Sequence, residues 1–294
     1  MDIRDDMENE INDLLKKYDI LRKACPSNLR MMKILEKSLK ETSTYSWALS
    51  LISKYYCGID RDNLPRIMLS TNLMRVAYHV AQENVYLRRI NELRLRIAES
   101  FMDSAVDLLV PLYDRTELCG QIDKIKEIIT IHNTFLRQQF YHPQIWTMDD
   151  WMGYVENNPE VNIIFWASGL IMSDRFVKQH DLFNEPFFKC AESHYARLEL
   201  TSWKEYLIKN KPSLLRSYIL TKYQNQANIY DIEKSIYQSD ELLFLINIIN
   251  VNMTAFSIYV KKYFQKEYKT VINDTFYLYE RVVKYSQLRR QQLM

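Results

Sequence analysis

The chain has 294 residues, a formal net charge of +2 and four glycines. At the average usage of roughly 7%, a chain of this length would hold about twenty glycines. Tight hairpin turns and phosphate-binding loops need glycine, because it accepts backbone angles and close approaches that side chains prevent. The composition therefore excludes a sheet-rich protein and a glycine-loop nucleotide-binding domain. We predict an all-α fold, a large multi-helix bundle of about ten to thirteen helices with no significant sheet.

The cysteines stand far apart in the sequence, at Cys25, Cys57, Cys119 and Cys190. Without a CxxC pair or a Cys/His cluster, neither a zinc site nor a redox motif is expected. The chain begins with acidic residues, unlike the basic and then apolar start of a signal peptide. We expect a cytoplasmic protein with reduced cysteines, no metal and no cofactor.

Prolines and polar clusters divide the chain into three predicted helical parts. Residues 66–110 and 213–294 contain neither glycine nor proline, and both stretches exceed a single helix of about 8–20 residues. The more broken middle holds four of the five tryptophans. We predict an N-terminal part over residues 1–110, an aromatic-rich middle over 111–212 and a C-terminal part over 213–294, which together could form one domain.

Both ends of the chain are predicted to form amphipathic helices with heptad spacing. Six acids lie within the first 13 residues, whereas the last 34 residues hold eight bases. The heptad positions are Met7, Ile11, Leu14, Tyr18 and Leu21 at one end, and Val271, Thr275, Leu278, Val282 and Tyr285 at the other. Such stripes fit packing on the chain's own core as well as contact with a partner subunit. The predicted partner is a second copy of the chain, bound through the terminal helices.

Residues 78–100, YHVAQENVYLRRINELRLRIAES, contain no helix breaker and are predicted to form one long inner helix. His79 and Glu83 are one turn apart but lack the third ligand that a metal site needs. On a helical wheel Glu83 and Arg94 project into the apolar face. Eleven residues of helix would separate them by about 16 Å, too far to pair directly. We therefore predict that Glu83 and Arg94, with His79 at the edge, are buried polar or pocket residues.

Hydroxyl side chains suggest helix N-caps at Ser70, Thr147 and Thr201. The second of these opens an aromatic stretch, WTMDDWMGY, over residues 146–154. Aromatic side chains crowded at a loop-to-helix corner form either a secondary core or a ligand pocket. We favour the core.

Residues 242–260 form an uncharged stretch of 19 residues, close to the length of a membrane span. Three asparagines, Asn247, Asn250 and Asn252, would be costly in hydrocarbon unless they were paired. We therefore predict a fully buried central helix and no membrane contact.

Basic and aromatic residues alternate near the C-terminus, as in YVKKYFQKEYK over residues 259–269. Lysine and arginine contact phosphate regardless of base sequence, and aromatic rings stack on bases. A solvated polar helix face would have the same composition. The predicted residues for binding single-stranded RNA or DNA are Lys261, Lys262, Lys266, Lys269, Arg281, Lys284, Arg289 and Arg290.

The sequence contains no catalytic motif and identifies no catalytic residue. The candidates for an all-α enzyme are His79, Glu83, Glu192, His194 and Glu199. Glu192 and His194 are two residues apart, so they face opposite sides of a helix.

Magnesium chemistry on a diphosphate substrate would need an aspartate-rich cluster on helices that face a pocket. Asp5, Asp6 and Glu10 have part of this pattern but stand at the chain start, with no preceding helix to form a pocket wall. Asn273 and Asp274 lack a further acid at the required spacing. We do not expect this chemistry.

These observations favour a non-enzymatic helical protein that works by association, namely a viral or phage-like structural protein, nucleoprotein or assembly factor. It would self-associate and bind single-stranded nucleic acid. The alternative is an all-α enzyme with a metal- or substrate-binding pocket inside the helical bundle. A regulatory module that binds a peptide in a helical groove is a third hypothesis.

Overall fold

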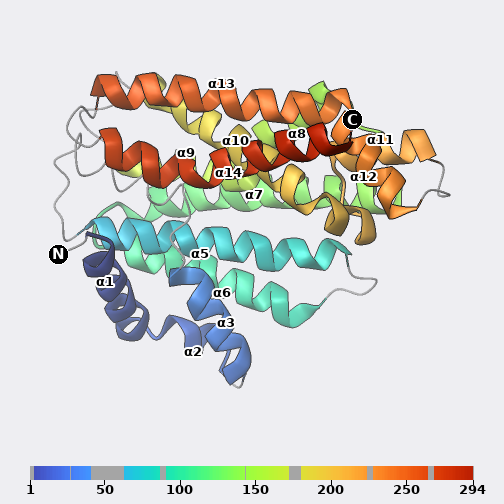
Figure 1. The fold of residues 1–294 in the computed structure, drawn as a ribbon. Coiled ribbons are helices and arrows are strands. Elements are labelled where there is room, and N and C mark those ends of the chain that lie inside the picture. Colours follow the sequence, from blue (N-terminus) through green and yellow to red (C-terminus); the bar gives the residue numbers. More distant parts are fainter. Residues whose placement is uncertain are drawn as a thin grey trace. The chain divides into compact units, whose positions relative to one another are not determined.

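The computed structural model describes residues 3–26, 28–40, 63–86, 91–142, 144–171, 180–223, 228–263 and 268–293. These residues form helices joined by turns and contain no strand, which confirms the all-α prediction. In chain order the helices are α1 (Ile3–Lys17), α2 (Ile20–Ala24), α3 (Leu29–Lys40), α5 (Leu64–Gln82), the 3-10 helix η2 (Glu83–Tyr86), α6 (Glu92–Leu109), α7 (Arg115–Tyr141), α8 (Met148–Glu156), α9 (Pro159–Ile171), α10 (His180–Ile208), α11 (Leu214–Tyr223), α12 (Ile229–Gln238), α13 (Asp240–Tyr263) and α14 (Tyr268–Leu293) (Figure 1).

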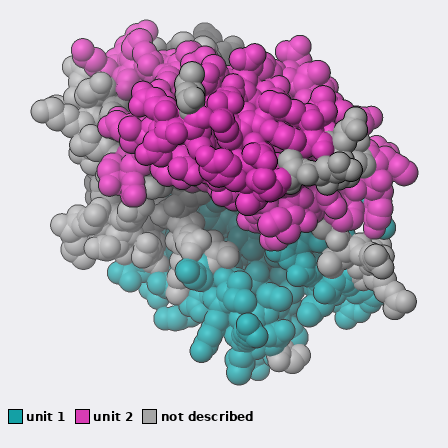
Figure 2. Space-filling view, turned by 45° about the vertical axis from the view of Figure 1, so that its right-hand side comes forward, with its two compact units in different colours: residues 1–137, 159–180 teal, residues 138–158, 181–294 magenta. Residues whose placement is uncertain are grey.

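The chain falls into two compact units, each made of two stretches of sequence (Figure 2). Unit 1 comprises Met1–Arg137 and Pro159–His180, and unit 2 comprises Gln138–Asn158 and Asp181–Met294. The predicted division into residues 1–110, 111–212 and 213–294 stays a prediction.

Helix α5 supplies much of the core of unit 1 and packs against α1, α3, α6 and α9. Polar side chains inside this core are hydrogen-bonded, as buried polar groups require. The Ser70 hydroxyl donates to the carbonyl oxygen of Ala105 at 3.2 Å, and the Asn72 amide donates to that of Leu39 at 3.1 Å. The predicted N-cap at Ser70 is wrong, because α5 begins at Leu64, with proline in its first turn where the missing N–H is tolerated.

The prediction of one inner helix over residues 78–100 is also wrong. Helix α5 ends at Gln82, η2 follows, and α6 begins at Glu92 and packs against α5. The Asn91 N–H donates to the Asn84 side-chain oxygen at 3.0 Å, and the Asn84 amide donates to the Asn91 carbonyl oxygen at 3.3 Å. Asparagine satisfies turn backbone in this way without glycine or proline, so a breaker count misses the turn.

Unit 2 contains the predicted aromatic core around α8. Thr147 caps this helix through a reciprocal pair with Asp150, which confirms the predicted N-cap. Trp151 is 1% exposed and lies edge-on to Phe244 of α13, with ring centroids 5.9 Å apart. Tyr154 contacts Tyr195 of α10 in the same edge-on manner. The stretch therefore forms a core, as predicted. The predicted N-cap at position 201 is wrong, because that residue lies inside α10.

Helix α13 buries one face and exposes the other, so the prediction of a fully buried helix is wrong. Leu245 and Ile249 are buried, whereas Val251 and Ile258 are 62% and 66% exposed. Of the described helices, α13 is the one long and apolar enough to cross a membrane by length and composition. A single such helix is weak grounds for a membrane protein, because core helices of soluble proteins have the same composition.

Candidate ligand-binding cleft

An open cleft of about 450 Å³ lies in unit 2 between α10, α12 and α14. The residues that line it are Arg197, Leu200, Thr201, Trp203, Lys204, Glu233, Tyr237, Arg281, Val282, Tyr285 and Ser286. Helical spacing places them together, because residues three, four or seven apart share a helix face. Each of the three helices therefore contributes one stripe of side chains to the cleft.

Cationic side chains outnumber acidic ones among the lining residues, at three to one. Arg197 lies 5.9 Å from the centroid of the Tyr279 ring, and Arg281 lies 5.6 Å from that of Tyr277. Within the described part of the chain, neither arginine has a carboxylate at ion-pair distance. An arginine stacked on an aromatic ring keeps its N–H donors available for an anion. The cleft can therefore attract an anionic group.

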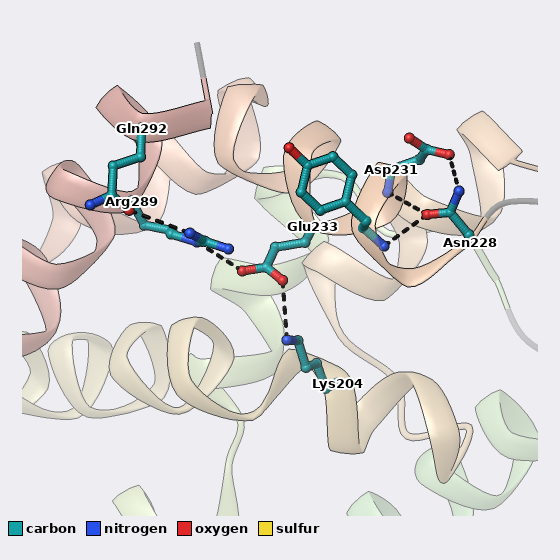
Figure 3. Close-up of polar contacts among 7 residues, drawn as sticks. Lys204, Asn228, Asp231, Glu233, Arg289 and Gln292 are labelled. Carbon is teal, nitrogen blue, oxygen red and sulfur yellow. Dashed lines mark hydrogen bonds and ion pairs between the residues drawn. The ribbon is translucent and has the colours of Figure 1, made fainter.

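Glu233 of α12 bridges two further cations, as Figure 3 shows. One of its oxygens accepts a hydrogen bond from Lys204 Nζ of α10 at 3.3 Å, and the other accepts one from Arg289 Nε of α14 at 3.0 Å. Burial alone would raise the pKa of Glu233, but the hydrogen bonds and charges of Arg289 and Lys204 outweigh it and lower the pKa. Glu233 is therefore the internal anion of the cleft.

Tyr237 and Tyr285 add hydroxyl groups to the cleft. Burial, followed by the effect of Tyr285 and the negative charge of Glu233, raises the pKa of Tyr237 to about 12. The phenol is therefore protonated at neutral pH and can donate a hydrogen bond. The apolar part of the lining comes from Leu200, Val282 and the ring of Trp203. Together these side chains suit a ligand with an anionic group and an apolar part.

The residues predicted as a buried polar pocket lie elsewhere, in unit 1. Glu83 and Arg94 form a direct ion pair, because the turn between α5 and α6 brings them together. The Glu83 side chain is 64% exposed, so the predicted burial is wrong. His79 is half exposed and lies 3.7 Å from Glu160, a buried carboxylate that also pairs with Arg75. The predicted polar residues form surface and interhelical ion pairs.

Two of the acids proposed for an all-α enzyme, Glu192 and Glu199, are buried on α10, and each has a different hydrogen-bond partner. Glu192 accepts a hydrogen bond from the Asn252 amide at 2.7 Å, and burial raises its pKa. Glu199 accepts hydrogen bonds from two backbone N–H groups at the start of α11. His194 lies 3.5 Å from Arg197. In the described stretches no group of three or more acids, histidines or cysteines could hold a metal ion.

The acidic pattern considered for a diphosphate chemistry lies largely outside the described side chains. Those of Asp5, Asp6, Asn273 and Asp274 are not described, whereas Glu10 is exposed. Among the described residues, no cluster of acids, histidines or cysteines fits a metal centre.

The basic residues predicted to bind nucleic acid do not form one strip. Arg281 lines the cleft, Arg289 pairs with Glu233, and Lys284 lies 3.9 Å from Glu280. Lys261 and Lys262 are exposed at the end of another helix, α13, and Arg290 is partly buried. Lys266 and the side chain of Lys269 lie outside what the structure describes.

Sequence reasoning missed Arg197, Lys204, Glu233 and Tyr237. The seven-residue spacing of Arg197 and Lys204 places both on one face of α10. The same spacing is normal on a solvated helix, so it does not distinguish these residues from an ordinary polar face.

No protein-family model and no curated protein matches the sequence. Among solved structures, a heptaprenyl diphosphate synthase from Staphylococcus aureus matches with a TM-score of 0.62 and 12% identity, over 93% of this chain and 98% of the other. The chain has the fold of that synthase. A geranylgeranyl pyrophosphate synthetase from Pyrococcus horikoshii Ot3 matches over 97% of both chains at 12% identity, but its TM-score of 0.43 supports no conclusion.

The prediction of a non-enzymatic structural protein, a viral nucleoprotein that binds RNA, is contradicted by this match, because the solved protein with the same fold is an enzyme. Composition misled here. Scarce glycine and a basic, tyrosine-rich C-terminal helix are compatible with any large helical protein. At 12% identity the match establishes the fold alone.

Proposed function

We propose that the protein is an all-α enzyme whose substrate carries a phosphate or diphosphate group, held in the cleft between α10, α12 and α14. The observation that carries this proposal is the pair of arginines, Arg197 and Arg281, which face the cleft and have no carboxylate partner among the described residues. Arginine presents a planar fork of donors that matches phosphate oxygens.

The remaining lining indicates the kind of molecule attached to the anionic group. Trp203, Leu200 and Val282 offer apolar surface beside the cations. Ligand sites typically combine such surface with a few polar groups that fix orientation. The fold supports the same class of substrate, since the matching enzyme is a synthase of a prenyl chain that ends in a diphosphate. We therefore propose an organic diphosphate with an apolar chain.

Turnover of prenyl diphosphates tests the proposal. The purified chain is incubated with prenyl diphosphates of several lengths, alone and in pairs, and released diphosphate and chain-length products are measured. Arg197→Gln should lower kcat/KM at least about tenfold, the value of a lost charge-assisted hydrogen bond. Lys284→Gln is the matched control, because Lys284 is 73% exposed on α14 and does not line the cleft. It should keep wild-type turnover.

Two results would contradict the proposal. One is a folded protein that turns over no phosphate ester or diphosphate in the presence of divalent cations. The other is an Arg197→Gln variant as active as the wild type. Binding without turnover would make the chain a binding module rather than an enzyme.

We also propose a soluble, cytoplasmic protein that self-associates through its terminal helices. Exposed apolar surface on α14 outside the cleft, such as Leu288 at 59%, supports a contact with a second copy. Sedimentation over a range of concentrations tests this, and a monomer at every concentration would contradict it.

A further inference from the structure

We infer that Glu233 is an internal competitor of the ligand in this cleft. In the ligand-free protein it binds Lys204, and an arriving anionic group takes Lys204 over while Glu233 keeps Arg289. This inference rests on the proposed function, since it concerns the same cleft and an anionic ligand. Glu233 would therefore set the affinity of the cleft for its anionic ligand.

The bridge has two unequal arms. Glu233 is only 15% exposed, Arg289 is 31% exposed and Lys204 is 53% exposed. Arg289 is further held by Gln292, whose side-chain oxygen accepts from its Nη1 at 3.3 Å. Lysine is a flexible, hydrated point charge, whereas arginine has a rigid fork. Lys204 is therefore the arm that can exchange its partner.

In the ligand-free protein, Lys204 already lines the cleft. Its ammonium group is 5.1 Å from the centroid of the Trp203 ring, and both residues line the cleft with Glu233. An anion that accepted a hydrogen bond from Lys204 would stand about 6 Å from the Glu233 carboxylate, given the 3.3 Å from Lys204 to Glu233 and a further bond of about 3 Å. The ligand and Glu233 would then repel each other.

Magnitudes decide the sign of the effect. Two unit charges about 6 Å apart repel by an energy equal to about a 3- to 100-fold change in affinity, over effective dielectric constants of 80 to 20. Lys204 is 53% exposed, and an ion pair with an exposed lysine contributes at most about a fivefold change through holding the lysine in place. Repulsion therefore outweighs orientation. Removal of the negative charge should tighten binding of the ligand.

Calorimetric titration with inorganic diphosphate tests this in the full-length chain. Glu233→Gln should bind diphosphate about tenfold more tightly than the wild type. Glu280→Gln removes the same negative charge from an exposed face of α14. Glu280 is 54% exposed and does not line the cleft. That control should stay within about twofold of the wild type, because solvent screens a charge on an exposed helix face.

A double-mutant cycle separates competition from a purely structural role. If Glu233 competes for Lys204, then Lys204→Gln should cost more affinity in the Glu233→Gln background than in the wild type. A structural bridge would change unfolding without this coupling. Equal or weaker diphosphate binding by a folded Glu233→Gln variant would overturn the inference.

A second measurement uses the wild type alone, in case Glu233→Gln does not fold. Diphosphate should shift the NMR signal of the Lys204 side chain while that of Arg289 Nε stays in place. Diphosphate binding that leaves the Lys204 signal unchanged would refute the exchange. The proposed function fails differently, through absent diphosphate binding or through Arg197→Gln and Arg281→Gln variants that bind like the wild type.

Discussion

Glu199 of α10 is a buried carboxylate, 4% exposed, that caps another helix. Its oxygens accept hydrogen bonds from the backbone N–H groups of Leu214 and Leu215, at 3.1 and 3.5 Å. These donors begin α11, where helix N–H groups have no partner inside the helix. Burial raises the pKa of Glu199 to about 7, although the hydrogen bonds act in the opposite direction.

This pKa predicts how stability depends on pH. Between the ordinary value of 4.5 and about 7 the native state binds more protons at Glu199 than the unfolded chain does. The free energy of unfolding should therefore fall as pH rises across that window. In the wild type this decrease should be on the order of 1–3 kcal/mol between pH 4.5 and 7, measured by urea unfolding, and Glu199→Gln should abolish it.

Glu205→Gln is the control for this experiment. Glu205 lies on the same helix, and hydrogen bonding from Lys209 lowers its pKa. Glu205 therefore affects the pH dependence of stability only at pH values below 4.5. Above that value, Glu205→Gln should show the same change of unfolding free energy with pH as the wild type. A Glu199→Gln slope equal to that of the wild type would contradict the assignment.

Single residues were predictable where the determining contact is local. Thr147 caps α8 because Asp150 stands three residues on and completes the capping box. Ser70 and Thr201 offer the same hydroxyl but lie inside α5 and α10. Their surroundings are set by packing, which the local sequence does not contain.

At the scale of elements, the turn between α5 and α6 has the largest effect on the interpretation of unit 1. An asparagine pair, Asn84 and Asn91, closes it in place of a glycine or proline. Once the chain turns, Glu83 and Arg94 face each other instead of lying far apart on one helix. A helical wheel drawn through one continuous helix therefore placed Glu83 on the buried face, although it is 64% exposed, and kept it apart from Arg94.

Asn84→Ala tests the role of this pair. Asn84 is 7% exposed, and its loss leaves the Asn91 N–H without its acceptor. We expect a decrease of about 1–3 kcal/mol in the free energy of unfolding, measured by urea denaturation. Glu99→Ala, on an exposed position of α6, should stay within about 0.5 kcal/mol of the wild type. Equal stability of both variants would show that the turn does not depend on the pair.

The sequence correctly predicts that α14 is a helix, but it does not predict which of its faces is buried. The predicted heptad stripe includes Val282 and Tyr285, which border the cleft. Among the described side chains of α14, the buried ones are instead Tyr279, Val283, Ser286 and Leu293. Two or three heptads do not fix the rotation of a helix, because one residue turns it by about 100°. The existence of the element was predictable, and its orientation was not.

At the scale of the whole molecule, composition was enough for the class of fold, since four glycines leave little room for sheets. The particular fold was beyond sequence reasoning, because the matching synthase shares only 12% of its residues with this chain. Core positions accept many apolar side chains of suitable volume, so a fold can persist while its sequence changes.

The candidate site was hidden for a related reason. Its charged residues Arg197, Glu233 and Arg281 lie on three helices and meet only after the chain folds. Arg281 and Arg289 were selected from the sequence as part of a basic strip. In the folded protein one borders the cleft and the other pairs with Glu233. Basic residues that are close in the sequence thus predicted one nucleic-acid-binding surface, but in the folded protein they lie in different surroundings.

The most direct measurement of the central claim is the affinity for diphosphate of a variant that lacks both cleft arginines, Arg197 and Arg281. The Arg197→Gln/Arg281→Gln double variant should bind inorganic diphosphate about 100-fold more weakly than the wild type, because it loses two charge-assisted contacts. Lys261→Gln/Lys262→Gln, which removes two exposed charges of α13, should bind nearly as the wild type does. Equal loss in both double variants, or no diphosphate binding by the wild type, would contradict the account.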